Sequence, residues 1–598
     1  MTDTYYDLGD HRRTVTTSSP QAQVWFDRGL LWAYCFNFEE AVRCFEKAVV
    51  EDPECAMAHW GIAFAKGPDY NKAWRFFDAA DLKASVDRAN GALERARAAS
   101  VSCTPFERSL IEAMAARFPR HGLPEGPDGF AALDRAYADA MREVYRAHPE
   151  DLDSAALFAD ALLCVSPRAL WDLDTGEPVG YGTLEAREVI ELAFARSGGD
   201  RHPALNHLYI HLMEMSPFPE TALPAADRLR NLAPDGGHMA HMSTHIDAAC
   251  GDWRRVVESN AVAVAADDRF FARENGRHWY ALYRAHNLCV LAYGAMMSGR
   301  SREALDAARR IDALVTPELL RIDSPPMADL MESYRTTLPH VLIRFGRWQE
   351  ILELGLPQDQ ELFCSTTAMT HYARGIAFSA LGRIAEAEAA REQFAAARTA
   401  VPETRWNAVP AKEVDVLEVA AGMLEGELEY RKGNFEAAFA ALERAVEAED
   451  ALPYTDPPAW LQPVRHAYGA LSMEQGRIEE AAAIYRADLY LDRTLARRRT
   501  HPNNVWSLHG LHECLTLLGR QAEAGQVALA RDIAVASADV PVAASCFCRL
   551  SAFEDGAASG CCGTRGEQDT DDAQNADDAQ NADDAQDSDT TACSCCAQ

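Results

Sequence analysis

The feature that most constrains this 598-residue chain is a spaced pattern of small and aromatic residues near its N-terminus. The pattern consists of Trp25, Gly29, Trp32, Ala41, Phe45, Ala48 and Pro53. Gly29 and Ala41 are small where two helices would cross closely, and the aromatic residues would fill the space between helix pairs. Pro53 would end the second helix. Such a pair buries its apolar face against further pairs, so the pattern predicts a chain that grows by stacking.

A recurring turn supports this prediction along the rest of the chain. Glycine followed by Asp, Asn or Arg recurs at intervals of 36 to 51 residues: Gly251, Gly299, Gly346, Gly382, Gly433, Gly476 and Gly519. Glycine adopts the left-handed conformation that ends one helix before the next begins. We therefore expect about nine or ten helical hairpins, some longer than the usual repeat of about 34 residues.

These patterns predict an all-α, TPR-like α-solenoid, a right-handed superhelix of tetratricopeptide-repeat (TPR) hairpins. The tail repeats DDAQNA and is too polar to fold, so we expect it to be acidic, Cys-containing and disordered. The expected segments are an N-terminal extension (1–19), N-terminal hairpins (20–170), an irregular loop and connecting helix (171–200), histidine-rich hairpins (201–300), C-terminal hairpins (301–554) and the tail (555–598).

Charge and hydropathy exclude several classes of partner. The formal net charge of −33 would repel nucleic-acid phosphates, so we expect no nucleic-acid binding. No uninterrupted apolar run reaches the roughly 18 residues of a membrane span, and the first residues lack the pattern of a signal peptide. We expect a cytoplasmic protein without a membrane partner. Phosphate-binding loops, a GxSxG elbow and an HExxH motif are also absent from the sequence.

Histidines are concentrated in residues 202–245, and their register is regular. His207 and His211 share one helix face, with Glu214 three residues further on. His241 and His245 repeat this spacing 34 residues later, which is one repeat.

Two further histidines extend the pattern. His238 lies 13 residues before Gly251, and His286 lies 13 before Gly299. Neighbouring first helices of such hairpins pack roughly 10 Å apart, so their imidazoles could meet.

This cluster permits three interpretations. Convergent imidazoles with a carboxylate could bind a transition metal, namely zinc, iron or copper. The histidines could instead be buried residues that hydrogen-bond to backbone or carboxylates, or they could bind an anionic peptide or substrate. Tyr280, Tyr283 and Asn287 lie near the same wall and are candidates for contacting a ligand in the groove, although aromatic residues at helical spacing more often serve packing.

The segments FNFEEAVRCFEKAVVEDPECAMAHWGIAFAKGPDYN, NHLYIHLMEMSP and APDGGHMAHMSTHI resemble a widespread group of bacterial TPR proteins. The resemblance extends to about residue 550 and includes NNVWSLHGLHECL and ASCFCRL. It implies a TPR solenoid in which the histidine segments are a signature, and it implies no catalytic role. Ser243-Thr244 departs from the group, where a Pro-Ser pair is usual before the last histidine.

Seven of the 16 cysteines lie in the last 53 residues. Cys593, Cys595 and Cys596 form a possible thiolate cluster that would suit Cu(I) or Zn. Cys546 and Cys548 form a Cys-x-Cys that could join them or serve packing. Most other cysteines are expected to be buried and reduced.

The sequence therefore leaves three functional hypotheses open. The first is a scaffold that binds a protein, peptide or small-molecule ligand in its concave groove. The second is a metalloprotein or metal-dependent enzyme that uses the histidine cluster. The third is metal sequestration by the cysteine tail.

Overall fold

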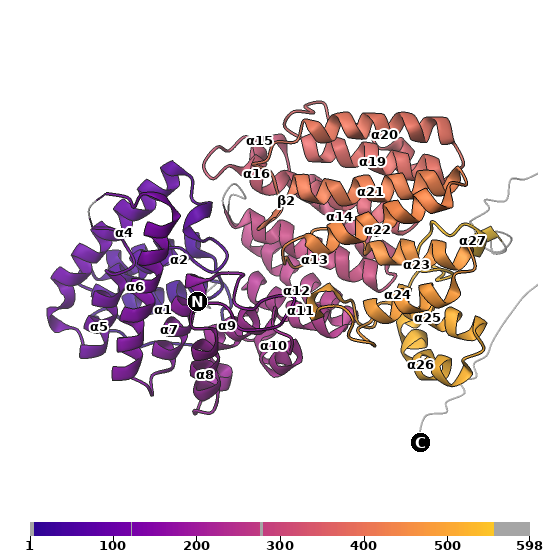
Figure 1. Cartoon of the computed structure of the whole chain (residues 1–598). Helices are drawn as coiled ribbons and strands as arrows, with labels where there is room; N and C mark the ends of the chain where they lie inside the picture. The colour runs from indigo at the N-terminus through magenta and orange to yellow at the C-terminus, as the bar shows by residue number, and fades with distance from the viewer. Residues whose placement is uncertain (1–4, 121, 275–278, 555–598) are drawn as a thin grey trace, which may run out of the picture. The chain divides into compact units, whose positions relative to one another are not determined.

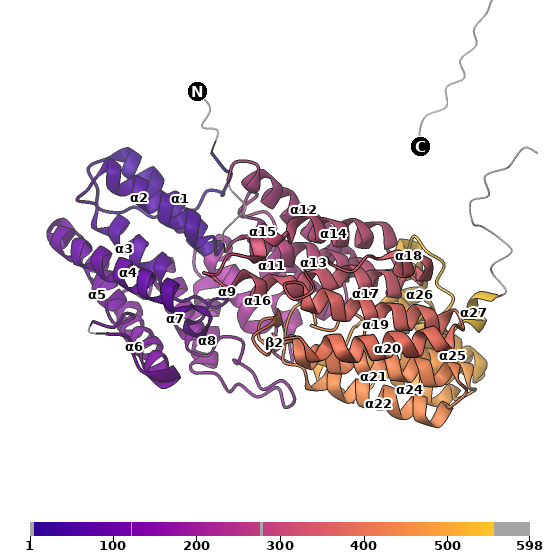
Figure 2. The same cartoon turned by 90° about the horizontal axis from the view of Figure 1, so that it is seen from above.

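The computed structural model describes residues 5–120, 122–274 and 279–554, which lie within one compact unit, and the predicted acidic tail lies outside the described residues. Its helices follow one another as antiparallel hairpins (Figures 1 and 2). The N-terminal helices are α1 (Pro20–Tyr34), α2 (Phe38–Glu51), α3 (Ala56–Lys66), α4 (Ala79–Ala99), α5 (Pro105–Met114), α6 (Gly126–Ala147), α7 (Leu152–Val165) and α8 (Thr183–Phe194).

The central helices are α9 (Pro203–Met213), α10 (Leu223–Leu229), α11 (Gly237–Cys250), α12 (Trp253–Phe271), α13 (Ala281–Met297), α14 (Ser301–Leu314), α15 (Pro317–Leu320), α16 (Met327–Met331), α17 (Thr337–Arg344) and α18 (Trp348–Glu353). The C-terminal helices are α19 (Cys364–Ala380), α20 (Ile384–Thr399), α21 (Glu413–Arg431), α22 (Phe435–Ala451), α23 (Val464–Glu474), α24 (Ile478–Asp488), α25 (Val505–Leu517), α26 (Gln521–Ser537) and α27 (Ser551–Glu554).

Short elements occupy the connections between these helices. The 3-10 helices are η1 (Trp74–Phe76), η2 (Ser100–Ser102), η3 (Gly199–Arg201), η4 (Pro219–Ala222), η5 (Glu332–Thr336) and η6 (Arg497–Arg499). Strands β1 (Trp406–Ala408) and β2 (Ala411–Lys412) form a small antiparallel hairpin between α20 and α21. The prediction of an all-α solenoid is confirmed, and this hairpin is a local addition to it.

The hairpins form for the reasons that the sequence indicated. Ser19 caps α1 by accepting a hydrogen bond from the backbone of Ala22, and Pro20 occupies the first turn. The seven predicted turn glycines all have positive φ, between 62° and 82°. The first hairpin differs, because Phe36 occupies the equivalent position with a φ of 55°. There the N–H of Asn37 reaches back to the carbonyl of Trp32, as the N–H of Arg300 reaches Ala295 after Gly299.

Helix pairs interlock through an aromatic ring placed between two glycines. A Cβ added at Gly29 or Gly61 would lie 2.7 Å or 2.5 Å from the ring of Phe45. The same arrangement recurs at the other end of the stack, where the ring of Tyr485 fits between Gly469 and Gly510. The missing side chains let the backbones of successive hairpins approach the ring, which explains the small residues of the sequence pattern.

Distant hairpins also contact one another. The indole N–H of Trp253 donates to the carbonyl of Pro502 at 2.8 Å, and that of Trp506 donates to Met296 at 2.7 Å. At the other end, α1 contacts α9. Side chains and loops far apart in sequence are thereby brought to the central helices.

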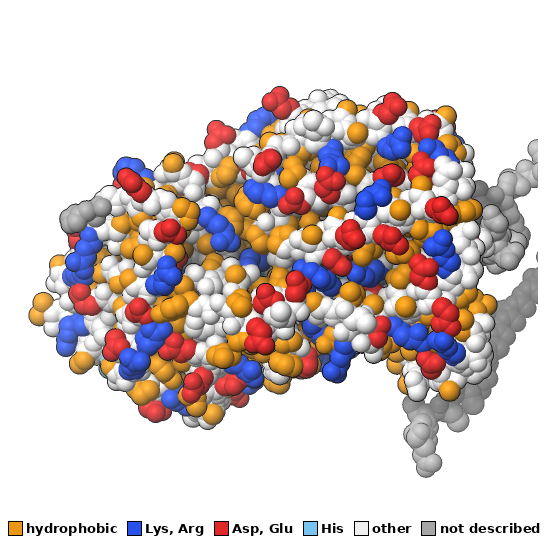
Figure 3. Space-filling view, viewed as in Figure 1, with side chains coloured by type: hydrophobic (Ala, Val, Ile, Leu, Met, Phe, Trp, Pro, Cys, Tyr) orange, Lys and Arg blue, Asp and Glu red, His pale blue; other side chains and the backbone are white. Residues whose placement is uncertain are grey.

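None of the helices in the described residues has the length and apolar character that a bilayer crossing requires. On the face drawn in Figure 3, acidic and basic side chains are interspersed and do not form a large patch of one sign.

The glycine-flanked ring yields a test of the packing. Phe45→Ala should lower the free energy of unfolding by about 3–5 kcal/mol, because a fully buried ring is lost between two rigid backbones. Urea denaturation followed by circular dichroism measures the change. Phe218→Ala, at a side chain that is 52% exposed, is the control and should shift stability by less than about 0.5 kcal/mol. Equal effects of the two substitutions would contradict this account.

Candidate metal centre

Three neighbouring first helices of the central hairpins carry six histidines. Helix α11 contacts both α9 and α13, so the register predicted from the sequence places the imidazoles against one another. The residues are His207 and His211 on α9, His238, His241 and His245 on α11, and His286 on α13. All are buried except His286, which is half-buried.

The six imidazoles form two triplets. In the first triplet, His207, His211 and His238 each offer one nitrogen, and these nitrogens lie within 4.8 Å of one another. The Nε2 atoms of His207 and His211 are 3.1 Å apart. Both ring nitrogens of His238 are buried and have no hydrogen-bond partner among the described residues.

The second triplet consists of His241, His245 and His286. The Nε2 atom of His241 lies 2.9 Å from that of His245 and 3.0 Å from that of His286. The two triplets adjoin, because the ring centroids of His238 and His241 are 5.7 Å apart.

Outward hydrogen bonds fix the protonation of the Nδ1 atoms. His207 Nδ1 faces the backbone carbonyl of Tyr34 at 2.8 Å, and a carbonyl can only accept, so this nitrogen carries the proton. His241 Nδ1 faces Asn260 Oδ1 at 2.9 Å. The amide nitrogen of Asn260 donates elsewhere, to Val256 and Thr244, so its oxygen is the acceptor.

Glu214 links the two triplets. One of its oxygens accepts from His211 Nδ1 at 3.0 Å, and the other accepts from His245 Nδ1. Burial alone would raise the pKa of Glu214, but the imidazoles of His245 and His211 lower it, so the carboxyl is ionised. Glu214 therefore orients both histidines from the side opposite their Nε2 atoms.

The Nε2 atoms of His207 and His211 consequently face each other as lone pairs. Burial, reinforced by neighbouring imidazoles, lowers the pKa of His207 and His238 well below the ordinary value, and burial also lowers that of His211. Neutral rings protonated at Nδ1 place no hydrogen between His207 Nε2 and His211 Nε2. Two lone pairs at 3.1 Å repel unless a cation lies between them.

In the second triplet, burial lowers the pKa of His241 well below the ordinary value and that of His286 to about 3. Burial also opposes protonation of His245, but Asp456 and Glu214 outweigh it and raise the pKa. A protonated His245 could donate to His241, so the first triplet gives the stronger indication of a cation site.

Phe36 covers the first triplet. Its ring centroid lies 4.4 Å from that of His207, and the ring stacks on His211 and His238 at 5.7 Å and 5.4 Å. The left-handed turn that holds Phe36 is unfavourable for a residue with a side chain, and such strain concentrates at functional sites.

A cavity of about 100 Å³ opens beside the histidines. Its walls include His211, His238, His245 and His286, together with side chains from several connections between helices. Those connections supply Asn71, Arg168, Val409, Thr455 and Asp456. Asp456 Oδ2 lies 3.2 Å from His245 Nδ1.

The residues predicted for the groove wall have separate positions. Tyr283 lines the cavity and packs on His238 with ring centroids 4.7 Å apart. Tyr280 and Asn287 instead hydrogen-bond to the buried carboxylate of Asp267, at 3.1 Å and 2.7 Å. These two residues join α12 to α13 behind the site.

A third group, formed by His11, Asp153 and His202, has another role. Asp153 already binds the guanidinium of Arg13 at 2.8 Å and the hydroxyl of Tyr34 at 2.6 Å. His202 Nδ1 accepts from the backbone of Leu205, so its Nε2 is protonated and donates to Asp153. No lone pair of His202 faces this carboxylate, so this group does not resemble the first triplet. Instead, it anchors the N-terminal extension to α7 and α9.

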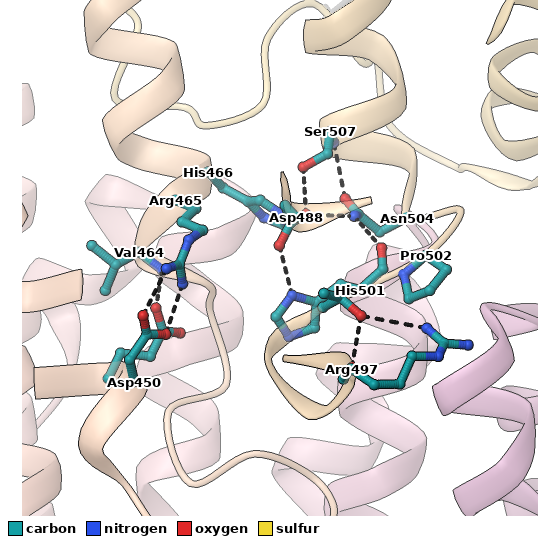
Figure 4. A network of polar contacts seen from close by, with 12 residues as sticks. Asp450, Val464, Arg465, His466, Asp488, Arg497, His501, Pro502, Asn504 and Ser507 are labelled. Atoms are coloured by element: carbon teal, nitrogen blue, oxygen red, sulfur yellow. Dashed lines mark hydrogen bonds and ion pairs between the residues drawn. The ribbon is translucent and has the colours of Figure 1, made fainter. Parts of the chain in front are cut away.

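A fourth buried network surrounds Asp488 (Figure 4). Its carboxylate contacts His466 at 3.2 Å and His501 at 2.7 Å, and it accepts from Ser507 at 2.6 Å and Asn504 at 2.9 Å. These contacts tie α24 to α23 and to the start of α25. The segment NNVWSLHGLHECL thus contributes to structure through its first residues.

The predicted cysteine cluster of Cys593, Cys595 and Cys596 lies outside the described residues. Cys546 and Cys548 are joined by a disulfide bond. The cysteines of the helical hairpins are free, and all except the half-buried Cys250 are buried.

Comparison with known proteins identifies the repeat. The family model described as tetratricopeptide repeat matches residues 22–55. No curated protein matches the chain. The protein is thus an all-α solenoid that contains a tetratricopeptide repeat.

Solved structures of other helical-repeat proteins are similar to this chain at low identity. The human IFIT1 dimer with m7Gppp-AAAA is 11% identical, with a TM-score of 0.31 over 87% of this chain and 92% of that chain. The APC/C hetero-tetramer Cut9-Hcn1 is 11% identical, with a TM-score of 0.29 over 83% and 76%. At these low scores, what those proteins bind carries no implication for this chain.

Three residues of the site, Phe36, Arg168 and Asp456, were not predicted from the sequence. A signal existed for each: Phe36 replaces a turn glycine, and the other two lie in stretches where proline and glycine interrupt the helical periodicity.

The anchor at Asp153 predicts a pH-dependent stability. Burial alone would raise the pKa of Asp153, but hydrogen bonds from His11 and His202 lower it well below the ordinary value. A lowered pKa contributes stability above the unfolded value of about 3.9, and this contribution is lost as the pH falls through and below that value.

Asp153→Asn should therefore cost on the order of 3 kcal/mol at neutral pH and progressively less below about pH 4. Chemical denaturation across a pH series measures the difference from the unsubstituted protein. Asp139→Asn, at an exposed ion pair with Arg142, is the control and should cost less than about 1 kcal/mol. A difference that does not change with pH would argue against the anchor.

Proposed function

We propose that the protein is a metalloprotein that holds two transition-metal ions, one in each histidine triplet. The observation that carries this proposal is the pair of unprotonated Nε2 atoms of His207 and His211, which face each other at 3.1 Å. Metal-ligating histidines usually donate their other ring nitrogen to a carbonyl or carboxylate. Tyr34, Asn260 and Glu214 supply these acceptors.

The ligand chemistry favours copper. Neutral imidazoles suit copper, zinc, iron and nickel, whereas calcium and magnesium prefer oxygen ligands. At sites of this kind, copper binds more tightly than the other divalent first-row metals. Glu214, and Asp456 beside His245, would offset the positive charge of two adjacent ions.

Three protein ligands leave at least one coordination position for water or a small molecule. The cavity at the edge of both triplets would give that molecule access to the metals. The resemblance to bacterial TPR proteins with histidine segments fits this proposal. A scaffold that holds a peptide in an open groove has less support, because side chains from connections far apart in sequence enclose the space in front of α11 and α13.

Metal content tests the two triplets separately. Protein produced without a histidine tag and with copper supplied should contain about two equivalents of metal by ICP-MS. His207→Ala and His241→Ala should each retain about one equivalent, and the double substitution should retain none. His59→Ala, at a buried helical histidine outside the cluster, should leave the content unchanged.

The full chain with Cys593, Cys595 and Cys596 changed to Ser separates this proposal from sequestration by the tail. If the serine variant loses the metal while the double histidine variant keeps it, the histidine centre is excluded.

Phe36 allows a second test. Phe36→Gly should preserve the fold, because glycine occupies the equivalent turn in later hairpins. Loss of the ring over three imidazoles should weaken metal affinity by roughly tenfold, as expected for a residue that supports ligands. Competition with a chelator of known affinity measures the effect. Phe36→Leu keeps the strained turn and apolar bulk, so it separates ring stacking from backbone strain; unchanged affinity in both variants would contradict the role of Phe36.

A further inference from the structure

Among the described residues that line the histidine cavity, Arg168 is the one with a permanent positive charge. It follows α7 in an irregular stretch and has a φ of 60°, a conformation that residues with side chains rarely adopt. Strain of this kind persists where surrounding contacts hold a residue in place.

The guanidinium has few partners of its own. Nη2 donates to Asn71 Oδ1 at 2.8 Å, and Nε is buried without a hydrogen-bond partner. The salt bridges of the described residues do not include Arg168, although Glu214 and Asp456 lie near the same cavity and engage the histidines. Arginine presents five donors, so most of its hydrogen-bonding capacity is available.

Arg168 acts on the groups around the cavity. Burial raises the pKa of Tyr334 in the cavity wall, and the charge of Arg168 opposes that rise. It likewise helps to lower the pKa of Arg75, which packs over Phe76 at the cavity wall.

Asn71 connects this side to the histidines. It accepts from Arg168, and its Nδ2 donates to the hydroxyl of Tyr283 at 3.5 Å. Tyr283 in turn packs on His238 of the first triplet. A ligand held by Arg168 would therefore lie within a continuous set of contacts that reaches the proposed metal ligands.

We infer that the cavity binds a small monocarboxylate with an apolar or aromatic body, and that Arg168 receives its carboxylate. Arginine matches a carboxylate through two parallel hydrogen bonds. Phe76, Leu282, Leu330 and Tyr334 would enclose the apolar body. A single guanidinium opposed by Asp456 suits one negative charge better than the double charge of a phosphate.

This inference rests on the proposed metal centre for its functional meaning, because the ligand would be the molecule presented to the metals.

Isothermal titration calorimetry on the full chain tests the inference, with 3-phenylpropionate as the probe and 3-phenylpropanol as its neutral counterpart. The carboxylate should bind at least about tenfold more tightly than the alcohol. Arg168→Gln should abolish that preference, and Arg321→Gln, in a different surface hollow, should retain it.

Arg168→Gly is a second variant, because glycine adopts the left-handed conformation at this position without strain and should keep the fold. Circular dichroism and metal content should match the unsubstituted protein in both variants. Equal binding of acid and alcohol, or a preference that survives both substitutions, would overturn the inference.

Metal content shows whether a negative result refutes the carboxylate site or the proposed metal centre. Full metal content with no role for Arg168 would refute the anion site alone. An Arg168-dependent preference for the carboxylate in a chain that binds no metal would support the anion site and refute the metal centre.

Discussion

The structure depends on the close stacking of helical hairpins, which aromatic rings between glycines make possible. Phe45 between Gly29 and Gly61 shows the arrangement at one end, and Tyr485 shows it at the other. Because successive hairpins repeat their geometry, equivalent positions on α9 and α11 become neighbours in space. Residues 34 apart in sequence, such as His207 and His241, are thus brought onto adjacent helices. The same packing that stabilises the chain therefore sets the spacing of the histidine triplets.

Hydrogen-bond direction decides what these histidines can do. The clusters around Asp153 and Asp488 also consist of buried polar contacts, but their histidines face carboxylates. In the first triplet the acceptors lie on the outer side, at Tyr34 and Glu214, and the inner nitrogens are left as lone pairs. Burial disfavours protonation, which would otherwise relieve their repulsion. A cation would satisfy these lone pairs, and this is why we propose a metal centre here and a structural role for the other two clusters.

Residues from distant parts of the sequence meet at the site because distant hairpins contact the central helices. Tyr34 and Phe36 come from the first hairpin, Arg168 from the stretch after α7, and Asp456 from the connection after α22. None of these is close in sequence to α11. Contacts between α1 and α9, and between the C-terminal hairpins and the central helices, bring them to one cavity.

The helical hairpins, their turn glycines and the register of the six histidines could be predicted from the amino-acid sequence, because they follow from local periodicity and from a repeat that neighbouring hairpins share. It also indicated Glu214, which lies on the same helix face as His211. The folded structure was needed to show that Glu214 faces Nδ1 atoms. It also showed that Tyr280 and Asn287 bind Asp267 behind the site. Finally, it brought Phe36, Arg168 and Asp456 to the histidines. The physical reason is that hydrogen-bond direction and loop position depend on contacts between segments hundreds of residues apart, which no local period encodes.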